Sequence, residues 1–216
     1  MAEPRYRVGV IGTGRIASTI QDEVVASPFS FLLPYSHAGA YEAHPATSIV
    51  AAADPSAERL DAFGERWSVD QLYADYLQML SREDLDIVSV CVPTRAHAQV
   101  MSAIATSDVR GVFMEKPIGR TLREADDMIA GTDQAGIKVV VNHVRTFDPY
   151  YRRVRWLIES GTVGRVRSVM VRWHEGMSFG GSHLFDLLRF LLGSEARDPR
   201  QAVIAARREP FIVVSE

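Results

Sequence analysis

Short apolar runs alternate with amphipathic stretches over the first 144 residues of the chain. Five runs rich in valine, isoleucine and alanine have the length of buried strands, and the stretches between them repeat their apolar positions at helical spacing. Strands are expected at residues 7–11, 47–55, 86–93, 110–117 and 138–144, and helices at 15–27, 56–67, 75–84, 94–106 and 121–136. Apolar strands separated by helices indicate a parallel sheet that is covered on both faces. The pattern predicts a doubly wound α/β domain.

The pattern changes after this region. The elements expected there are a helix at 148–161, an alternating strand at 165–174 and an apolar helix at 182–193. In the strand, Val169 and Val171 share one face and Met170 lies on the other, which is typical of a sheet with one buried face. The chain is therefore expected to form two domains, residues 1–144 and 145–216.

The composition is that of an ordinary globular chain. Of its 216 residues, 47% are apolar and 24% are charged, and the formal net charge is −3. This balance gives no reason to expect nucleic acid or an anionic membrane as a partner. No apolar run approaches the roughly 18 residues that span a bilayer, and the first residues lack the apolar centre of a signal peptide. We therefore expect a cytoplasmic protein.

Cysteine and histidine do not predict a metal site. The single cysteine, Cys91, is flanked by apolar residues and is interpreted as a small buried hydrophobe. His37, His44, His143 and His174 are scattered without the spacing of metal ligands, so no bound metal is expected.

The stretch VGVIGTGRIA has the spacing of a dinucleotide-binding loop. It follows a predicted strand and opens a predicted helix, with Gly12 permitting a tight turn, Gly14 permitting close approach of a pyrophosphate, and Ala17 permitting close packing. The phosphates would lie at the N-terminus of the helix. The residues expected to contact the cofactor here are Gly12, Thr13, Gly14, Arg15 and Ile16. A purely structural turn remains an alternative.

Asp54 ends the second predicted strand, where an adenosine ribose needs an acceptor for its hydroxyl group. An insertion at residues 27–46 explains its large separation from the glycines. For the insertion's Tyr35, His37 and Tyr41 a packing role is preferred over contact with the substrate or a neighbouring subunit. A helix N-cap is the other role open to Asp54. A carboxylate there repels a 2′-phosphate and favours NAD, whereas Arg59, one turn later, keeps NADP open as a cofactor.

The third and fourth strands end in CVPTRAH and MEKP, at the edge of the sheet where open α/β folds bind ligands. Pro93 and Pro117 keep the residues before them extended. Glu115 and Lys116 are therefore expected to face the site, although an isolated Glu-Lys-Pro tripeptide is usually a solvated loop. Only one other lysine, Lys138, occurs in the chain.

His183 lies in the first turn of the predicted helix after Ser182, a good N-cap. The positive end of the helix dipole disfavours the imidazolium, so a neutral ring able to accept a proton is expected. Asp186 could orient this ring or cap the backbone, and a plain surface histidine is the alternative.

Seven stretches occur in the order typical of one known family. They are VGVIGTGRIA, VAAADP, DIVSVCVPTRAH, MEKPIGRTLREADDMI, VNHVRTFDPYYRRVR, SGTVGRV and GSHLFDLLRFLLG. Through these stretches, residues 6–193 resemble the glucose-fructose oxidoreductase / inositol dehydrogenase (Gfo/Idh/MocA) family. The resemblance implies an N-terminal Rossmann domain and a C-terminal α/β domain whose open sheet lines the substrate site and forms oligomer contacts. It also implies NAD(P)-dependent oxidation of a secondary hydroxyl of a sugar, sugar nucleotide or cyclitol, or the reverse reduction.

The resemblance also assigns roles to single residues. Lys116 matches the lysine that binds the reacting hydroxyl and assists its deprotonation, and His183 matches its acid/base partner. Asn142 and Arg145 match positions near the substrate. The positions expected to line the nicotinamide and its ribose are Cys91, Val92, Pro93, Thr94, His97, Glu115 and Lys116. For His97, a role as a cap or in packing is equally open.

Two features depart from the family pattern. Many members carry an aspartate four residues before the catalytic histidine, where this chain has Phe179, and this shifts the expected substrate subgroup. Members also continue much further beyond the helix at 182–193, so the second domain is expected to be shortened. Its open sheet would invite association into a homo-oligomer.

Two function hypotheses follow. In the first, the protein is an NAD(P)-dependent dehydrogenase in which Lys116 and His183 handle the hydroxyl proton of a sugar-like substrate and the nicotinamide takes the hydride. In the second, it is a catalytically incompetent relative that binds the dinucleotide as a sensor or partner subunit. A flavin or nucleotide-sugar binder is disfavoured by the position of the Glu-Lys-Pro motif.

Overall fold

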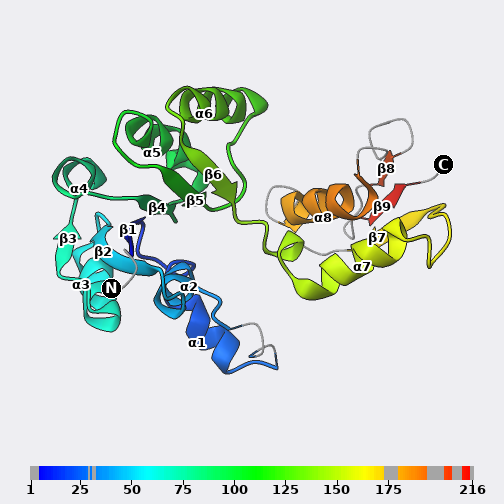
Figure 1. Cartoon of the computed structure of the whole chain (residues 1–216), viewed down its shortest axis with the longest axis horizontal. Coiled ribbons are helices and arrows are strands. Elements are labelled where there is room, and N and C mark those ends of the chain that lie inside the picture. Colours follow the sequence, from blue (N-terminus) through cyan, green and yellow to red (C-terminus); the bar gives the residue numbers. More distant parts are fainter. Residues whose placement is uncertain are drawn as a thin grey trace. The chain divides into compact units, whose positions relative to one another are not determined.

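The computed structural model describes residues 5–28, 30, 33–172, 180–193, 202–205 and 211–214. The chain divides into two compact units, Met1–Asn142 and His143–Glu216 (Figure 1). Each unit has its own sheet and its own apolar cluster.

A six-stranded parallel sheet forms the centre of the first unit, with the strand order β3-β2-β1-β4-β5-β6. Its strands are β1 (Tyr6–Ile11), β2 (Thr47–Ala53), β3 (Gln71–Tyr73), β4 (Ile87–Val90), β5 (Gly111–Met114) and β6 (Lys138–Val141). The direction of winding reverses between β1 and β4, because β2 and β3 lie on one side of β1 and the later strands on the other. This topology is that of a Rossmann fold and confirms the predicted doubly wound domain.

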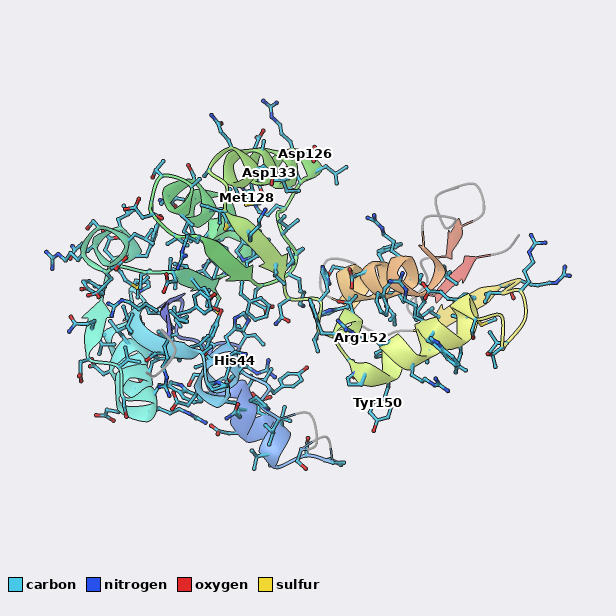
Figure 2. All side chains as sticks on the ribbon, in the orientation of Figure 1. His44, Asp126, Met128, Asp133, Tyr150 and Arg152 are labelled. Atoms are coloured by element: carbon cyan, nitrogen blue, oxygen red, sulfur yellow. The ribbon has the colours of Figure 1, made fainter. Side chains whose placement is uncertain are left out.

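Helices cover both faces of this sheet (Figure 1). They are α1 (Ile20–Val25), α2 (His37–Ala43), α3 (Ala57–Trp67), α4 (Tyr76–Arg82), α5 (His97–Ile104) and α6 (Leu122–Gln134). Successive residues of a strand point to opposite faces. Val10 accordingly packs in one cluster with Phe63 of α3. Ile11 packs in the other with Met101 of α5 and Met128 of α6, and Figure 2 shows Met128 on the side of α6 that faces the strands.

Strand β3 is absent from the sequence-based expectation. It has three residues, which is too short for a recognisable alternation, and it forms because Gln71, Leu72 and Tyr73 pair with the end of β2. The strand places the carbonyl of Tyr73 where it accepts from the N–H of Asp54 over 3.1 Å. This short strand therefore helps to hold Asp54 at the sheet edge.

The expected helix at 15–27 is wrong in its extent. Residues 15–19 form turns, α1 has only six residues, and α2 lies inside the segment taken for an irregular insertion. The N–H groups of His37 and Ala38 donate to the carbonyls of Ile16 and Ala17 over 3.2 and 2.9 Å. Helix α2 therefore starts directly on the turn that follows the glycine-rich loop.

The second unit contains an antiparallel sheet of three strands in the order β7-β9-β8. Its elements are η3 (Val144–Thr146), α7 (Pro149–Glu159), β7 (Val169–Arg172), α8 (Ser182–Leu192), β8 (Ala202–Ala205) and β9 (Phe211–Val214). Val169 and Val171 pack against Leu184 and Leu188 of α8, whereas Met170 is 74% exposed, which confirms the predicted alternation. The strand itself begins at Val169, later than expected, and residues 173 and 174 lie outside the described residues.

Candidate functional site

The glycine-rich loop requires glycine at its first turn. Gly12 has φ +88°, and a Cβ atom there would lie 2.8 Å from the carbonyl carbon and oxygen of Cys91. At Gly14 a Cβ atom would have no neighbour within 4 Å, so the loop is open at the second glycine. The hydroxyl oxygen of Thr13 is buried and has no hydrogen-bond partner among the described residues. The loop thus has free space beside Gly14 and a hydroxyl donor on Thr13 that can bind a phosphate oxygen, as a phosphate-binding loop requires.

Asp54 ties this loop to the end of β2. Its Oδ2 accepts from the N–H of Thr13 over 2.9 Å, and its Oδ1 accepts from the N–H of Ser56 over 2.9 Å. The guanidinium of Arg59 donates to both oxygens, over 3.3 Å and 2.7 Å. Burial opposes ionisation of this carboxyl, which is 5% exposed, but the hydrogen bonds from Arg59, Ser56 and Thr13 outweigh it and lower the pKa of Asp54.

The alternative role of Asp54 as a helix cap is wrong. Ser56 is the N-cap of α3, because its hydroxyl accepts from the N–H of Arg59 over 3.4 Å. Asp54 instead holds the backbone of the glycine-rich loop and the start of α3 together.

The remaining candidate residues of the first unit lie at the same edge of the sheet. Backbone pairing continues one residue beyond the strands, from Gly12 to Ala53, from Cys91 to Ile11, from Glu115 to Val90 and from Asn142 to Met114. All of these strands are parallel, so the residues at their carboxyl ends share one edge. This edge crosses the point between β1 and β4 where the winding reverses, which is the usual ligand-binding position of open α/β folds.

His97 is fully buried at this edge. Its ring nitrogens lie 3.0 Å from the carbonyl oxygen of Val92 and 3.2 Å from that of Ile118. The ring therefore links the segment after β4, which contains Pro93 and Thr94, to the segment after the Glu-Lys-Pro motif. Direct contact of His97 with a cofactor stays a prediction.

Sequence reasoning preferred a packing role for His37 over contact with substrate or a neighbouring subunit, and the structure places it in a polar cluster. Its ring is 2% exposed and lies 2.6 Å from Oγ of Ser89 and 3.0 Å from Oε1 of Glu115. The amide of Asn142 donates to the same carboxylate oxygen over 2.7 Å. A histidine four residues before a tyrosine is too common a pattern to reveal this cluster, and only the return of the chain at α2 brings it to the edge.

In the second unit, His183 lies in the first turn of α8 as expected, but Ser182 is not the N-cap. The helix begins at Ser182 and its N-cap is Gly181, which makes no side-chain capping bond. The ring of His143 meets that of His183 edge-on, with the ring centres 5.5 Å apart. Burial raises the pKa of Asp186 against the opposing charges of His143 and Arg189, and its Oδ2 has no hydrogen-bond partner among the described residues.

The predicted catalytic residues belong to different units. Lys116 is in Met1–Asn142, together with Asn142, whereas Arg145 of η3 and His183 are in His143–Glu216. Phe179, which replaces the aspartate of many relatives, lies outside the described residues. The joint action of Lys116 and His183 stays a prediction.

Within the described ranges, no three His, Cys, Asp or Glu side chains form a group able to hold a metal ion. None of the helices that the structure describes is both long and apolar enough to cross a bilayer.

The family of the chain follows from its similarity to known proteins. Residues 6–143 match the GFO_IDH_MocA family, described as "Oxidoreductase family, NAD-binding Rossmann fold". The chain belongs to this family. The resemblance inferred from the seven stretches is thereby confirmed, and the NAD-binding character of the Gfo/Idh/MocA fold agrees with the predicted cofactor.

Known relatives are longer than this chain. A myo-inositol 2-dehydrogenase of Thermotoga maritima is 25% identical over 206 residues, which cover 89% of this chain and 56% of that protein. A D-apiose dehydrogenase of Paraburkholderia graminis is 27% identical over 179 residues, which cover 75% and 48%. The crystal structure of a probable dehydrogenase from Thermotoga maritima superposes with a TM-score of 0.73 at 26% identity, covering 87% and 55%. The chain spans about half the length of these relatives.

Proposed function

We propose that the protein is an NAD-dependent oxidoreductase that transfers a hydride between the nicotinamide and a secondary hydroxyl or ketone of a cyclitol or sugar. The observation that supports this most directly is the hydrogen bond between Thr13 and Asp54 at the sheet edge that also presents Glu115 and Lys116. The bond joins the proposed phosphate-binding loop to the proposed ribose acceptor. Both lie at the sheet edge that carries Lys116, to which the family resemblance gives a catalytic role.

The residues fit a bound dinucleotide. Gly14 leaves its surroundings open and the hydroxyl of Thr13 needs a partner, so the loop from Gly12 to Ile16 would hold the pyrophosphate. Asp54 would accept from the adenosine ribose. The segment Val92, Pro93 and Thr94, with His97 and Glu115, would line the nicotinamide half. Bound NAD would supply the hydride acceptor, which no side chain of the protein can replace.

Lys116 and His183 would manage the proton. In the oxidative direction the substrate would lose one C–H hydride to the bound nicotinamide and one hydroxyl proton to the protein. Lys116 would hold the hydroxyl oxygen, and His183, supported by the edge-on ring of His143, would take the proton and return it to solvent. Asn142 and Arg145 would orient the other hydroxyl groups of the substrate.

Cofactor choice depends on Asp54 and Arg59. The carboxylate favours the 2′-hydroxyl of NAD and repels the 2′-phosphate of NADP. Arg59 neutralises this carboxylate, and 54% of its side chain is exposed and can turn toward a phosphate. We therefore propose NAD as the preferred cofactor, with NADP binding more weakly through Arg59.

The substrate class follows from relatives and not from the site alone. Myo-inositol and D-apiose, which appear in the names of two relatives, are both polyhydroxylated, so a compound with several neighbouring hydroxyl groups is proposed. The incompetent alternative is not favoured, because this chain keeps both Lys116 and His183.

Association of copies is proposed for the second unit. β7 and β8 are the outer strands of its sheet among the described residues, and an outer strand offers backbone groups to another chain. Sedimentation of the purified protein tests this: a dimer or larger species is expected, and a monomer at all concentrations would contradict it.

Reduction of NAD⁺ tests the proposed function. The wild-type protein is assayed with myo-inositol, D-apiose and a panel of related polyols, next to Lys116→Ala and Lys138→Ala. Since Lys138 is the other lysine and is exposed, its loss is the matched control. We expect turnover by the wild type and by Lys138→Ala, and a loss of about 100-fold or more in Lys116→Ala. Equal turnover by Lys116→Ala would contradict the proposal.

A further inference from the structure

A single imidazole links the glycine-rich loop to the Glu-Lys-Pro edge. His37 is the first residue of α2, whose backbone bonds directly to the turn at Ile16 and Ala17. From there its ring reaches Ser89 in β4 and Glu115 immediately after β5. Neighbouring parts of the proposed cofactor site, far apart in the sequence, are thus joined by one side chain.

We propose that His37 is a positioning residue for Lys116: it fixes the carboxylate of Glu115 and thereby the backbone that carries the lysine and the amide of Asn142. This inference rests on the proposed function, because positioning matters only if Lys116 handles the substrate hydroxyl. Neither the family match nor any named relative assigns this role to His37.

Each nitrogen of the His37 ring has a hydrogen-bond partner. Nε2 of His37 donates to Oε1 of Glu115 over 3.0 Å, and Nδ1 lies 2.6 Å from Oγ of Ser89. The hydroxyl of Ser89 reaches the carbonyl oxygen of Phe113 over 3.5 Å, so Ser89 can accept from the ring and donate onward. The ring also packs against that of Phe113, with the centres 4.5 Å apart. These contacts engage both ring nitrogens and one face of the ring.

The negative charge of Glu115 is a second reason why its carboxylate needs His37. Glu115 is 9% exposed, and a buried carboxylate is costly unless a cation or several donors compensate it. Asn142 supplies a neutral donor over 2.7 Å, and His37 supplies the donor that can also carry positive charge. Burial raises the pKa of Glu115. The hydrogen bonds from His37 and Asn142 and the positive charges of His37 and Lys116 outweigh burial, so the pKa is lowered overall.

The groups that face His37 from the neighbouring elements favour its protonated form. Burial lowers the pKa of His37, but the sulfur of Cys91 and the carboxylate of Glu115 outweigh burial and raise it to about 10. From α2, Tyr41 contributes no charge at neutral pH, because burial raises its pKa to about 12. Glu115 therefore carries the negative charge that the imidazolium compensates.

Positioning follows from the order of the residues directly after β5. Glu115 is held at its N–H by Val90 and at its carboxylate by His37 and Asn142, and Lys116 is the next residue. Without His37 the carboxylate would lose one of its two side-chain donors, and a water molecule would have to replace it. The backbone of Lys116 would then be free to move, and displacement of a catalytic group by about 1 Å can cost about 100-fold in rate.

Nitrogen-15 NMR of histidine-labelled protein tests the pair without any activity. The signal of His37 is identified by its loss in His37→Gln. We expect both ring nitrogens to stay protonated throughout the neutral range, and Glu115→Gln to lower the titration midpoint by about 1–3 pH units. His44→Gln is the control, since His44 lies exposed at the end of α2 (Figure 2) and should leave the midpoint unchanged. The same titration midpoint in the wild type and in Glu115→Gln would overturn the proposal.

Kinetics and cofactor binding test the positioning itself. In His37→Gln we expect kcat to fall about 10- to 100-fold while the Kd of NADH rises much less, because the loop at Gly12 and Asp54 keeps its own hydrogen bond. An unchanged kcat would overturn the proposal. So would a fall in kcat matched by an equal loss of NADH affinity, which indicates a structural role. Absence of turnover in the wild type contradicts the proposed function instead, and the NMR titration then still decides the His37–Glu115 pair.

Discussion

The backbone N–H of Thr13 donates to Oδ2 of Asp54 over 2.9 Å, across a sequence separation of 41 residues. The bond joins the loop after β1 to the residue after β2, and the same carboxylate receives the guanidinium of Arg59. The position of the loop therefore depends on one buried carboxyl group, to which we also assign the proposed roles of ribose acceptor and of discrimination between NAD and NADP. A change at Asp54 should alter all three together.

Replacement of Asp54 should weaken cofactor binding strongly. Asp54→Ala removes the acceptor of the Thr13 and Ser56 N–H groups, and loss of hydrogen bonds to a charged group costs about 1.5–3 kcal/mol. We expect the Kd of NADH to rise by about 10- to 100-fold in calorimetric titrations. Asp61→Ala, on the exposed side of α3, is the control. Equal affinity in the two variants would show that Asp54 does not contact the cofactor.

Removal of Arg59 should sharpen the preference for NAD. In Arg59→Ala the carboxylate of Asp54 is no longer neutralised, so repulsion of a 2′-phosphate increases while a ribose hydroxyl is still accepted. We expect the ratio of NADPH to NADH dissociation constants to rise about tenfold, an effect of roughly 1.4 kcal/mol. Arg123→Ala, a highly exposed arginine of α6, should leave the ratio as in the wild type. A lower ratio in Arg59→Ala would contradict this role.

Substitutions at the two loop glycines should change different quantities, the free energy of unfolding at Gly12 and the affinity for NADH at Gly14. Gly12→Ala forces a Cβ atom to 2.8 Å from the Cys91 backbone at a positive φ, so the free energy of unfolding should fall by about 1–3 kcal/mol. Gly14→Ala meets no atom within 4 Å, so unfolding should be unchanged while NADH binds more weakly. The control is Gly131→Ala in α6, also without a close neighbour, which should gain about 0.5–1 kcal/mol. Urea denaturation and NADH titration of the three variants measure both quantities.

The stability of the protein should depend on pH through His37 and Glu115. The pKa of His37 is raised to about 10 in the folded state, so its contribution is complete below the ordinary value of 6.5 and is lost as the pH rises through 10. The pKa of Glu115 is lowered, so its contribution is complete above the ordinary value of 4.5 and is lost as the pH falls through the folded value.

Denaturation between about pH 6 and pH 10 measures the histidine part of this dependence. The free energy of unfolding of the wild type should decline with rising pH in this window, and the decline should be smaller in His37→Gln. His44→Gln should follow the wild type. Identical slopes in all three proteins would exclude a contribution from His37.

Much of the first unit could be predicted from sequence, because the apolar runs of β1, β2, β4, β5 and β6 are strong and repeat with helices between them. The loop at Gly12 and the edge position of Asp54 followed from that pattern. By contrast, β3 is too short to show a period, and its pairing with β2 is a tertiary effect.

Sequence reasoning placed Glu115 and Asn142 at the edge but did not predict that His37 joins them in a polar cluster. His37 lies in a segment with proline and serine on both sides, and nothing local shows that α2 returns to the turn at Ile16 and Ala17. Its contact with Glu115 spans 78 residues, so only the folded chain reveals that the first residue of α2 is a buried partner of the Glu-Lys-Pro motif.

Calorimetric titration of the purified chain with NADH tests the central claim most directly. The loop from Gly12 to Ile16 and the carboxylate of Asp54 predict saturable binding at one site per chain, weaker binding of NADPH, and loss of most NADH affinity in Asp54→Ala. A folded sample that binds neither dinucleotide would contradict the assignment of this sheet edge as a cofactor site.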